Sequence, residues 1–152
     1  MRKVFVLVVA SCLTAAYAQA DKKPAQRYGI EADLANYPQA APKETLDSIL
    51  KAIERKRVDY LLAQLSDPQF VDKRVKDYGG NFEELVREAT ARFVDDPESV
   101  RKLRRILKDG EWEMDETTAT ARLKDIKERV FMKKIDERWF LENRTKVEAP
   151  AK

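Results

Sequence analysis

The sequence of 152 residues contains no histidine and a single cysteine, Cys12. The absence of histidine excludes Ser-His-Asp and Cys-His catalysis and removes the commonest ligand of zinc and copper. One cysteine cannot close an internal disulfide or build a thiolate metal site. The sequence also has no Gly-rich phosphate loop, no Cys-x-x-Cys pair and no calcium-loop spacing. We therefore expect no metal and no cofactor.

Long hydrophobic runs are scarce, and the clearest one lies within residues 1–20. Arg2 and Lys3 precede an apolar stretch that ends in the A-x-A pattern of a signal peptidase site, with cleavage after Ala18 or Ala20. About 15 apolar residues are too few to span ~30 Å of hydrocarbon, which needs roughly 20. The pattern predicts a cleaved signal peptide and an exported protein, periplasmic or secreted, with no transmembrane segment after processing.

Cys12 leaves one alternative to a soluble exported protein. The residues Val9-Ala10-Ser11-Cys12 resemble the lipobox of bacterial lipoproteins, in which the cysteine is acylated. The apolar run before Cys12 is near the lower limit of the ~7–15 residues of such a segment. This favours a plain residue of the signal peptide, and a lipoprotein anchored through Cys12 is the alternative.

An excess of positive charge is also lacking once the signal is removed. The whole chain has 30 Lys and Arg against 27 Asp and Glu, a formal charge of +3. Residues 1–20 hold two bases and no acid, so the rest has 28 bases against 27 acids, or +1. We therefore expect no nucleic-acid partner.

The remaining chain divides into three parts. Residues 21–42 contain three prolines and no apolar period, which predicts a linker or loosely docked arm. Residues 43–144 carry enough large apolar side chains for one α+β domain, and residues 145–152 read as a disordered tail.

Apolar spacings of three and four predict helices in the first half of this domain. Two stripes predict a helix over Thr45–Leu65 that bends near Arg55-Lys56-Arg57, and Ser66-Asp67-Pro68 stops it. Asn81 and Asp96 are expected to cap two further helices, and Gly110 to end the second as a C-cap glycine.

After Gly110 the apolar period changes from near four to two. Residues 111–115 and 118–124 alternate between apolar and polar side chains as strands do. Residues 130–135 and 139–142 are predicted to form two further strands joined around Asp136-Glu137. The sequence therefore predicts an α+β fold in which N-terminal helices pack on a curved antiparallel sheet.

The segment DPQFVD (Asp67–Asp72), the strand TATARL and the ending RVFMKKIDERWFLEN carry a resemblance. In this order, after a bent helix, they are similar to the nuclear transport factor 2-like superfamily, which includes SnoaL-like cyclases and ketosteroid isomerases. The sequence is most similar to exported members of this superfamily from bacterial cell envelopes, of the planctomycete type. The resemblance implies a cone of bent sheet closed by helices, a pocket at the wide end, and a homodimer through the exposed sheet face.

Enzymes of this superfamily use a pocket carboxylate as base, which this chain could supply from Asp67 or Asp72, with Tyr60 or Tyr78 as donor. A structural role for both aspartates is favoured over catalysis, because Asp67-Pro68 is a helix stop and Asp72 lies in a charged stretch.

A ligand pocket is the second candidate, and its expected lining is Tyr60, Phe70, Trp112, Met132 and Trp139. Aromatic residues at strand spacing more often form plain core. A basic helix face is the third candidate, formed by Arg101, Arg104, Arg105 and Lys108. It would bind an anion, although acids at the start of this helix and bases at its end also match the helix dipole.

The sequence thus favours an exported, non-catalytic binding or interaction module whose partner is an unknown small apolar ligand or a protein. The alternative is a small-molecule isomerase, cyclase or dehydratase that uses an Asp base without a metal. Polyanion binding through the basic helix face is a third class.

Overall fold

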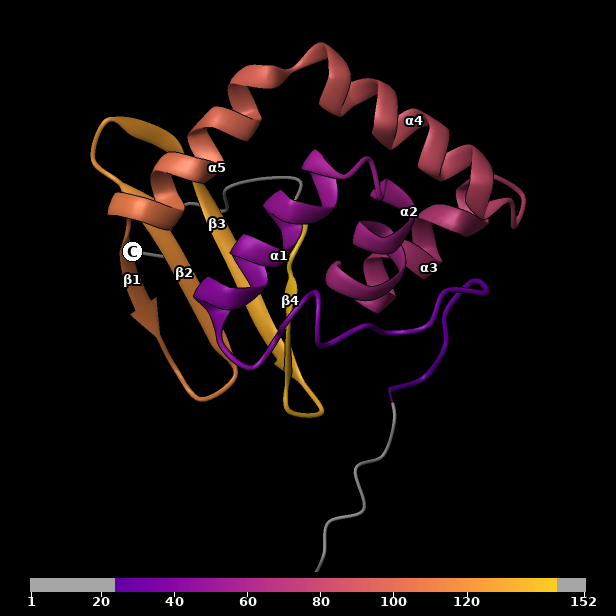
Figure 1. Cartoon of the computed structure of the whole chain (residues 1–152), viewed down its shortest axis with the longest axis horizontal. Helices are drawn as coiled ribbons and strands as arrows, with labels where there is room; N and C mark the ends of the chain where they lie inside the picture. The colour runs from indigo at the N-terminus through magenta and orange to yellow at the C-terminus, as the bar shows by residue number, and fades with distance from the viewer. Residues whose placement is uncertain (1–23, 145–152) are drawn as a thin grey trace, which may run out of the picture.

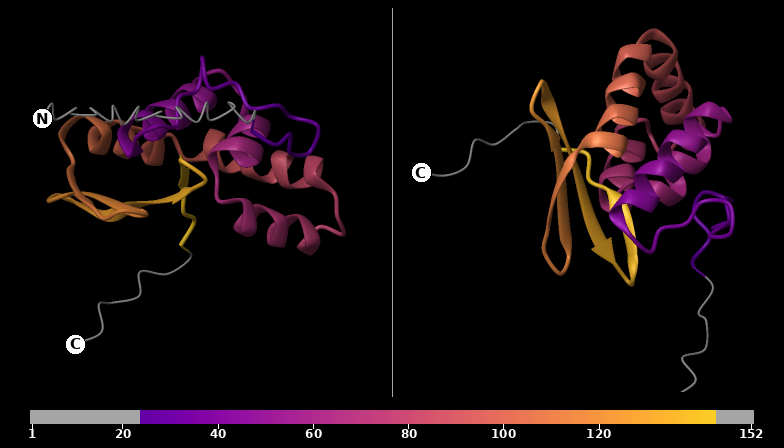
Figure 2. Two further views of the ribbon diagram at one scale, coloured as in Figure 1. Left: turned by 90° about the horizontal axis from the view of Figure 1, so that it is seen from below. Right: turned by 60° about the vertical axis from the view of Figure 1, so that its left-hand side comes forward.

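In the computed structural model, which describes residues 24–144, helices cover one face of a four-stranded antiparallel sheet (Figures 1 and 2). The elements are α1 Pro42–Glu54, α2 Val58–Tyr60, the π-helix η1 Leu61–Leu65, α3 Pro68–Asp77, α4 Phe82–Asp95, α5 Pro97–Asp109, β1 Glu111–Met114, β2 Thr118–Leu123, β3 Ile126–Ile135 and β4 Arg138–Leu141. The predicted α+β class is confirmed. The predicted signal peptide, with Cys12, Ala18 and Ala20, and the predicted tail lie outside the described residues.

The sheet is a meander in the order β1-β2-β3-β4, as the alternating pattern predicts. Asp136 and Glu137 both have positive φ, 46° and 64°, and they form the two-residue turn that a tight hairpin needs. Ala119 and Ala121 of β2 are buried with α5 over them, whereas the residues between and beside them are more exposed. One face of the sheet is therefore core and the other is turned away from the helices (Figure 2).

The predicted helix caps form. Asn81 Oδ1 accepts a hydrogen bond from the Glu84 amide at 3.2 Å, and Asp96 Oδ1 accepts one from the Ser99 amide at 3.0 Å. Gly110 is the C-cap of α5, as predicted, but its φ of −71° is not the left-handed conformation that usually selects glycine there. Glycine is needed there for space, since a Cβ would lie 2.3 Å from the carbonyl oxygen of Ile106.

The prediction of one bent helix over Thr45–Leu65 is also wrong. α1 ends at Glu54, and Lys56 has a φ of 57°, which breaks the helix. The physical reason is the five-residue step between the two apolar stripes, which one straight helix cannot place on the same face. After the break, the chain widens into η1, all five residues of which are buried, and the amide of Ser66 donates to the Leu61 carbonyl at 2.9 Å.

The described part of the predicted arm, residues 24–41, lies along α1, η1 and α3 (Figure 1). The ring of Tyr37 stacks on that of Tyr60 with centroids 4.3 Å apart, and the amide of Asp33 donates to the Tyr60 hydroxyl at 2.8 Å. Gln39, which is buried, donates through Nε2 to the carbonyls of Gln64 and Trp139. These contacts tie the segment to both layers.

The end of η1 joins the open edge of the sheet. Ser66 forms a parallel bridge with Leu141 of β4, and the amide of Asp67 donates to the Leu141 carbonyl at 2.9 Å. Because α3 and α4 follow directly, three helical segments and the end of β4 meet at this edge. The candidate site lies where they meet.

Candidate functional site

An open cleft of about 220 Å³ lies between η1, α3, α4 and the end of β4. Its lining residues come from all four elements and their junctions: Leu61, Leu62, Ser66, Phe70, Arg74, Leu85, Glu88, Ala89, Arg92, Phe93, Leu141 and Asn143. Its size suits a ligand smaller than the drug-sized molecules that occupy pockets of about 300–1,000 Å³.

The walls of the cleft are mostly apolar. η1 contributes Leu61 and Leu62, and α3 contributes Phe70. On α4, Leu85 and Ala89 are four residues apart and therefore lie on the same face of the helix, toward the cleft. The same spacing that buries α4 against the protein thus also forms one wall of the cleft.

Three charged side chains of the lining interact with one another. Arg92 donates to Glu88 Oε1, and Arg74 Nη2 lies 3.6 Å from Glu88 Oε2. Arg74 also donates to the hydroxyl of Tyr78 at 3.2 Å and pairs with Asp77 at 3.4 Å. The two guanidinium groups therefore already have carboxylate partners, and the cleft does not present a free cationic patch.

Two polar atoms of this lining are buried without a hydrogen-bond partner among the described residues, Ser66 Oγ and Glu88 Oε2. Ser66 is fully buried, with an exposed fraction of 0%. The described part of the chain contains one further such atom, Trp112 Nε1, on β1. Buried polar groups are nearly always paired in folded proteins, so two exceptions at one cleft indicate a place where a ligand atom can bind.

The five residues expected to line a ligand pocket do not meet at one cavity. Phe70 lines the cleft described above. Tyr60, Met132 and Trp139 are buried in the core, and Trp112 is half-buried and packs against it. Tyr60 is held by its stacking on the arm, and burial raises its pKa.

Asp67, the first candidate base, has structural partners. Its Oδ1 accepts from the amide of Gln69 at 3.0 Å and caps α3, and its Oδ2 lies 2.7 Å from Nζ of Lys133. Asp67 is nearly buried, and it does not line the cleft. The helix stop read from Asp67-Pro68 therefore appears in the structure as an N-cap and an ion pair across to β3.

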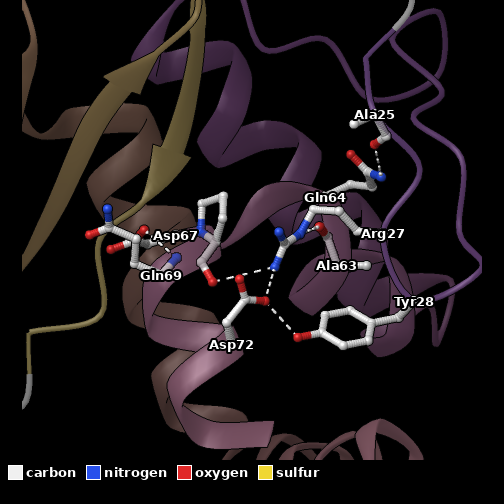
Figure 3. A network of polar contacts seen from close by, with 9 residues as sticks. Ala25, Arg27, Tyr28, Ala63, Gln64, Asp67, Gln69 and Asp72 are labelled. Carbon is white, nitrogen blue, oxygen red and sulfur yellow. Dashed lines mark hydrogen bonds and ion pairs between the residues drawn. The ribbon is translucent and has the colours of Figure 1, made fainter.

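Asp72, the second candidate base, holds the N-terminal arm (Figure 3). The Tyr28 hydroxyl donates to its Oδ1 at 2.6 Å, and the Arg27 guanidinium, which also donates to the Ala63 carbonyl, pairs with the same oxygen. Burial alone would raise the pKa of Asp72, but the hydrogen bonds from Tyr28 and Arg27 outweigh it and lower that pKa. Burial and the bond to this carboxylate raise the pKa of Tyr28 to about 12.

Three of the four cations of the basic face expected on α5 pair with acids, and the fourth, Lys108, has no acid partner among the described residues. Arg101 lies 3.1 Å from Glu98, Arg104 2.7 Å from Glu54, and Arg105 2.6 Å from Asp125. A second, wide and open hollow lies between α1 and α5. It is lined by Leu50 and Leu107 and by five charged residues: Asp47, Lys51, Glu54, Arg104 and Lys108. Carboxylates thus alternate with the cations that were expected to attract an anion.

Sequence reasoning missed Ser66, Arg74, Glu88 and Arg92 as site residues. A partial signal was present, because Leu85, Glu88, Ala89 and Arg92 recur at spacings of three and four on one helix. In the sequence, Ser66 belongs to a Ser-Asp-Pro pattern that indicates only the end of a helix. Its burial at the cleft depends on the contact between η1 and β4, which no local pattern reports.

Among residues 24–144, no cluster of three or more acidic side chains is arranged to hold a metal ion. Within the same range, none of the helices has the length and apolarity to cross a membrane. Comparison of the chain with known protein families, curated proteins and solved structures finds no significant match.

Proposed function

We propose that this protein is an exported, non-catalytic binding module and that the cleft between η1, α3, α4 and β4 holds its small apolar ligand. The observation that carries the proposal is an apolar cleft in which two buried oxygen atoms, Ser66 Oγ and Glu88 Oε2, have no hydrogen-bond partner among the described residues. Apolar walls with a few convergent polar atoms are typical of ligand sites.

The positions of the two candidate bases support a role without catalysis. A general base works best when its pKa lies near the working pH, and the pKa of Asp72 is lowered instead. The carboxylate of Asp67 is paired with Lys133 and caps a helix. Neither residue lines the cleft, so no observation favours the isomerase, cyclase or dehydratase alternative.

Export and a nuclear transport factor 2-like cone are part of the same proposal. The first rests on the signal pattern of residues 1–20, and the second on the sequence likeness together with helices packed on an antiparallel meander. Mass spectrometry of the mature N-terminus tests export. We expect a chain that starts after Ala18 or Ala20, and a diacylglyceryl group on Cys12 would contradict a soluble product.

Ligand binding is tested with ethylbenzene as probe, because apolar cavities of about 150 Å³ already bind benzene. We expect saturable shifts of the methyl NMR signals of Leu61, Leu85 and Ala89. Ala89→Phe fills the cleft and should abolish these shifts. Ala91→Phe, on an exposed position of the same helix, is the matched control and should leave them unchanged. Equal binding by both variants, or no saturable shift in the unmodified protein, refutes the proposed site.

A further inference from the structure

We propose that the natural ligand of the cleft is a compact, neutral molecule with an apolar ring or short chain and one hydroxyl group, such as a substituted phenol or alicyclic alcohol. This inference rests on the proposed function and adds the chemical class of the ligand. It follows from two buried oxygen atoms of the lining that have no hydrogen-bond partner among the described residues, Ser66 Oγ and Glu88 Oε2. Arg74 Nη2 lies 3.6 Å from Glu88 Oε2, which is an ion pair beyond hydrogen-bond distance.

The hydrogen-bonding capacities of these atoms define what the ligand must offer. An ionised carboxylate oxygen only accepts hydrogen bonds, so Glu88 Oε2 requires a donor. The hydroxyl of Ser66 both donates and accepts. A ligand hydroxyl can also do both: it donates to Glu88 Oε2 and accepts from Ser66 Oγ. An ether or ketone has no donor for Glu88, and a hydrocarbon serves neither atom.

The charges of the lining exclude ionic ligands. Arg74 and Arg92 flank Glu88, which already pairs with both. A carboxylate ligand would bring a second acceptor-only group to Glu88 Oε2 and would find both guanidinium groups engaged. An ammonium ligand would supply the donor, but it would lie beside two positive charges. A neutral hydroxyl meets the requirement without either penalty.

The volume of the cleft limits the size of the apolar part of the ligand. About 220 Å³ is room for a ring with a short substituent and excludes a long acyl chain or a sterol. Leu61, Leu85 and Ala89 offer aliphatic contact, and Phe70 offers an aromatic face.

The test compares four probes with one scaffold: 4-ethylphenol, 4-ethylanisole, 4-ethylbenzylamine and 4-ethylbenzoate. Dissociation constants are measured by isothermal titration calorimetry on the full chain, with the cleft methyl signals in NMR reporting the site. We expect 4-ethylphenol to bind about tenfold to a hundredfold more tightly than 4-ethylanisole, because a hydrogen bond to a charged group contributes that much. Both ionic probes should bind more weakly than 4-ethylphenol.

Two variants test the two atoms separately. Glu88→Gln replaces the acceptor-only group with an amide that also donates, so the ratio between phenol and anisole should fall toward one. Glu84 is a half-buried carboxylate of the same helix that pairs with Arg87 and does not line the cleft. Glu84→Gln is therefore the matched control and should keep the ratio. Ser66→Ala removes a donor that the oxygen of either probe can use, so it should weaken 4-ethylphenol and 4-ethylanisole alike and leave the binding of ethylbenzene unchanged.

Equal affinities for 4-ethylphenol and 4-ethylanisole, with both shifting the cleft methyls, overturn the hydroxyl class and leave the binding module standing. The hydroxyl class is also overturned if 4-ethylbenzoate or 4-ethylbenzylamine binds more tightly than 4-ethylphenol. If no probe, including ethylbenzene, shifts the cleft signals, the proposed function itself fails. If Val147→Asp tightens the binding of every probe alike by tenfold or more, segment 145–152 occupies the cleft and the small-ligand class is overturned.

Discussion

The same substitution, serine to alanine, should change the free energy of unfolding in opposite directions at two fully buried serines. Ser48 Oγ donates to the Pro38 carbonyl at 2.8 Å, whereas Ser66 Oγ has no hydrogen-bond partner among the described residues. Both side chains have an exposed fraction of 0%. Burying a hydroxyl without a partner costs about 1–3 kcal/mol, so removing it should relieve most of that cost.

We expect Ser66→Ala to raise the free energy of unfolding by about 1 kcal/mol, since the space left by one oxygen offsets part of the gain. Backbone propensity contributes little, because Ser66 lies outside a helix, with φ −95° and ψ 155°. Ser48→Ala should lower the free energy of unfolding by about 1 kcal/mol. It loses a hydrogen bond and leaves the Pro38 carbonyl without that donor, against a gain of about 0.5 kcal/mol in helix propensity.

Urea unfolding followed by tryptophan fluorescence measures both changes, with Trp139 as a buried reporter. A shift of the midpoint at constant m-value isolates the change in stability. A loss of stability in Ser66→Ala as large as that in Ser48→Ala would refute the reasoning, because it would mean that the Ser66 hydroxyl already has a good partner in the free protein.

Three other regions give further predictions. The pKa of Tyr28 in the folded protein is raised from 10.0 to about 12, so its neutral phenol stabilises the fold below pH 10, and this stabilisation is lost as the pH rises toward 12. The melting temperature should therefore fall less between pH 8 and pH 11 in Tyr28→Phe than in the unmodified protein. Gly110→Ala should lower the free energy of unfolding by about 1–3 kcal/mol in urea titrations, because its methyl would collide with the carbonyl of Ile106, and unchanged stability would contradict that close approach. Arg104→Gln and Arg105→Gln should each cost less than about 1 kcal/mol and leave retention on an anionic column almost unchanged, because both cations are exposed and paired with acids; a large loss of salt-sensitive retention would instead favour an anion-binding face.

Local features of the fold could be predicted from the sequence. The caps at Asn81 and Asp96 depend on one side chain and an amide three residues later, so the sequence pattern contains the whole interaction. The meander is similarly visible, because alternating burial and short turns are both local. At Gly110 the residue indicated a helix end, but its reason is the space near Ile106 rather than a left-handed backbone.

The site itself depends on distant contacts, which the sequence does not report. Ser66 is buried because the chain after η1 pairs with Leu141, 75 residues later. The N-terminal arm gave no apolar period, yet Gln39 bonds to Trp139 and Arg27 pairs with Asp72, through single side chains that leave no repeating pattern. The predicted pocket of Trp112, Met132 and Trp139 followed from strand alternation, which separates the two faces of a sheet but does not distinguish a filled core from a cavity.

The central claim is that the cleft between η1, α3, α4 and β4 is the ligand site, and intermolecular NOEs between ethylbenzene and the methyl groups of the protein test it most directly. We expect NOEs from the probe to Leu61, Leu62 and Leu85. NOEs to Leu50 and Leu107 instead would place the probe in the open hollow between α1 and α5 and would contradict the claim. An absence of any intermolecular NOE at saturating probe would contradict it as well.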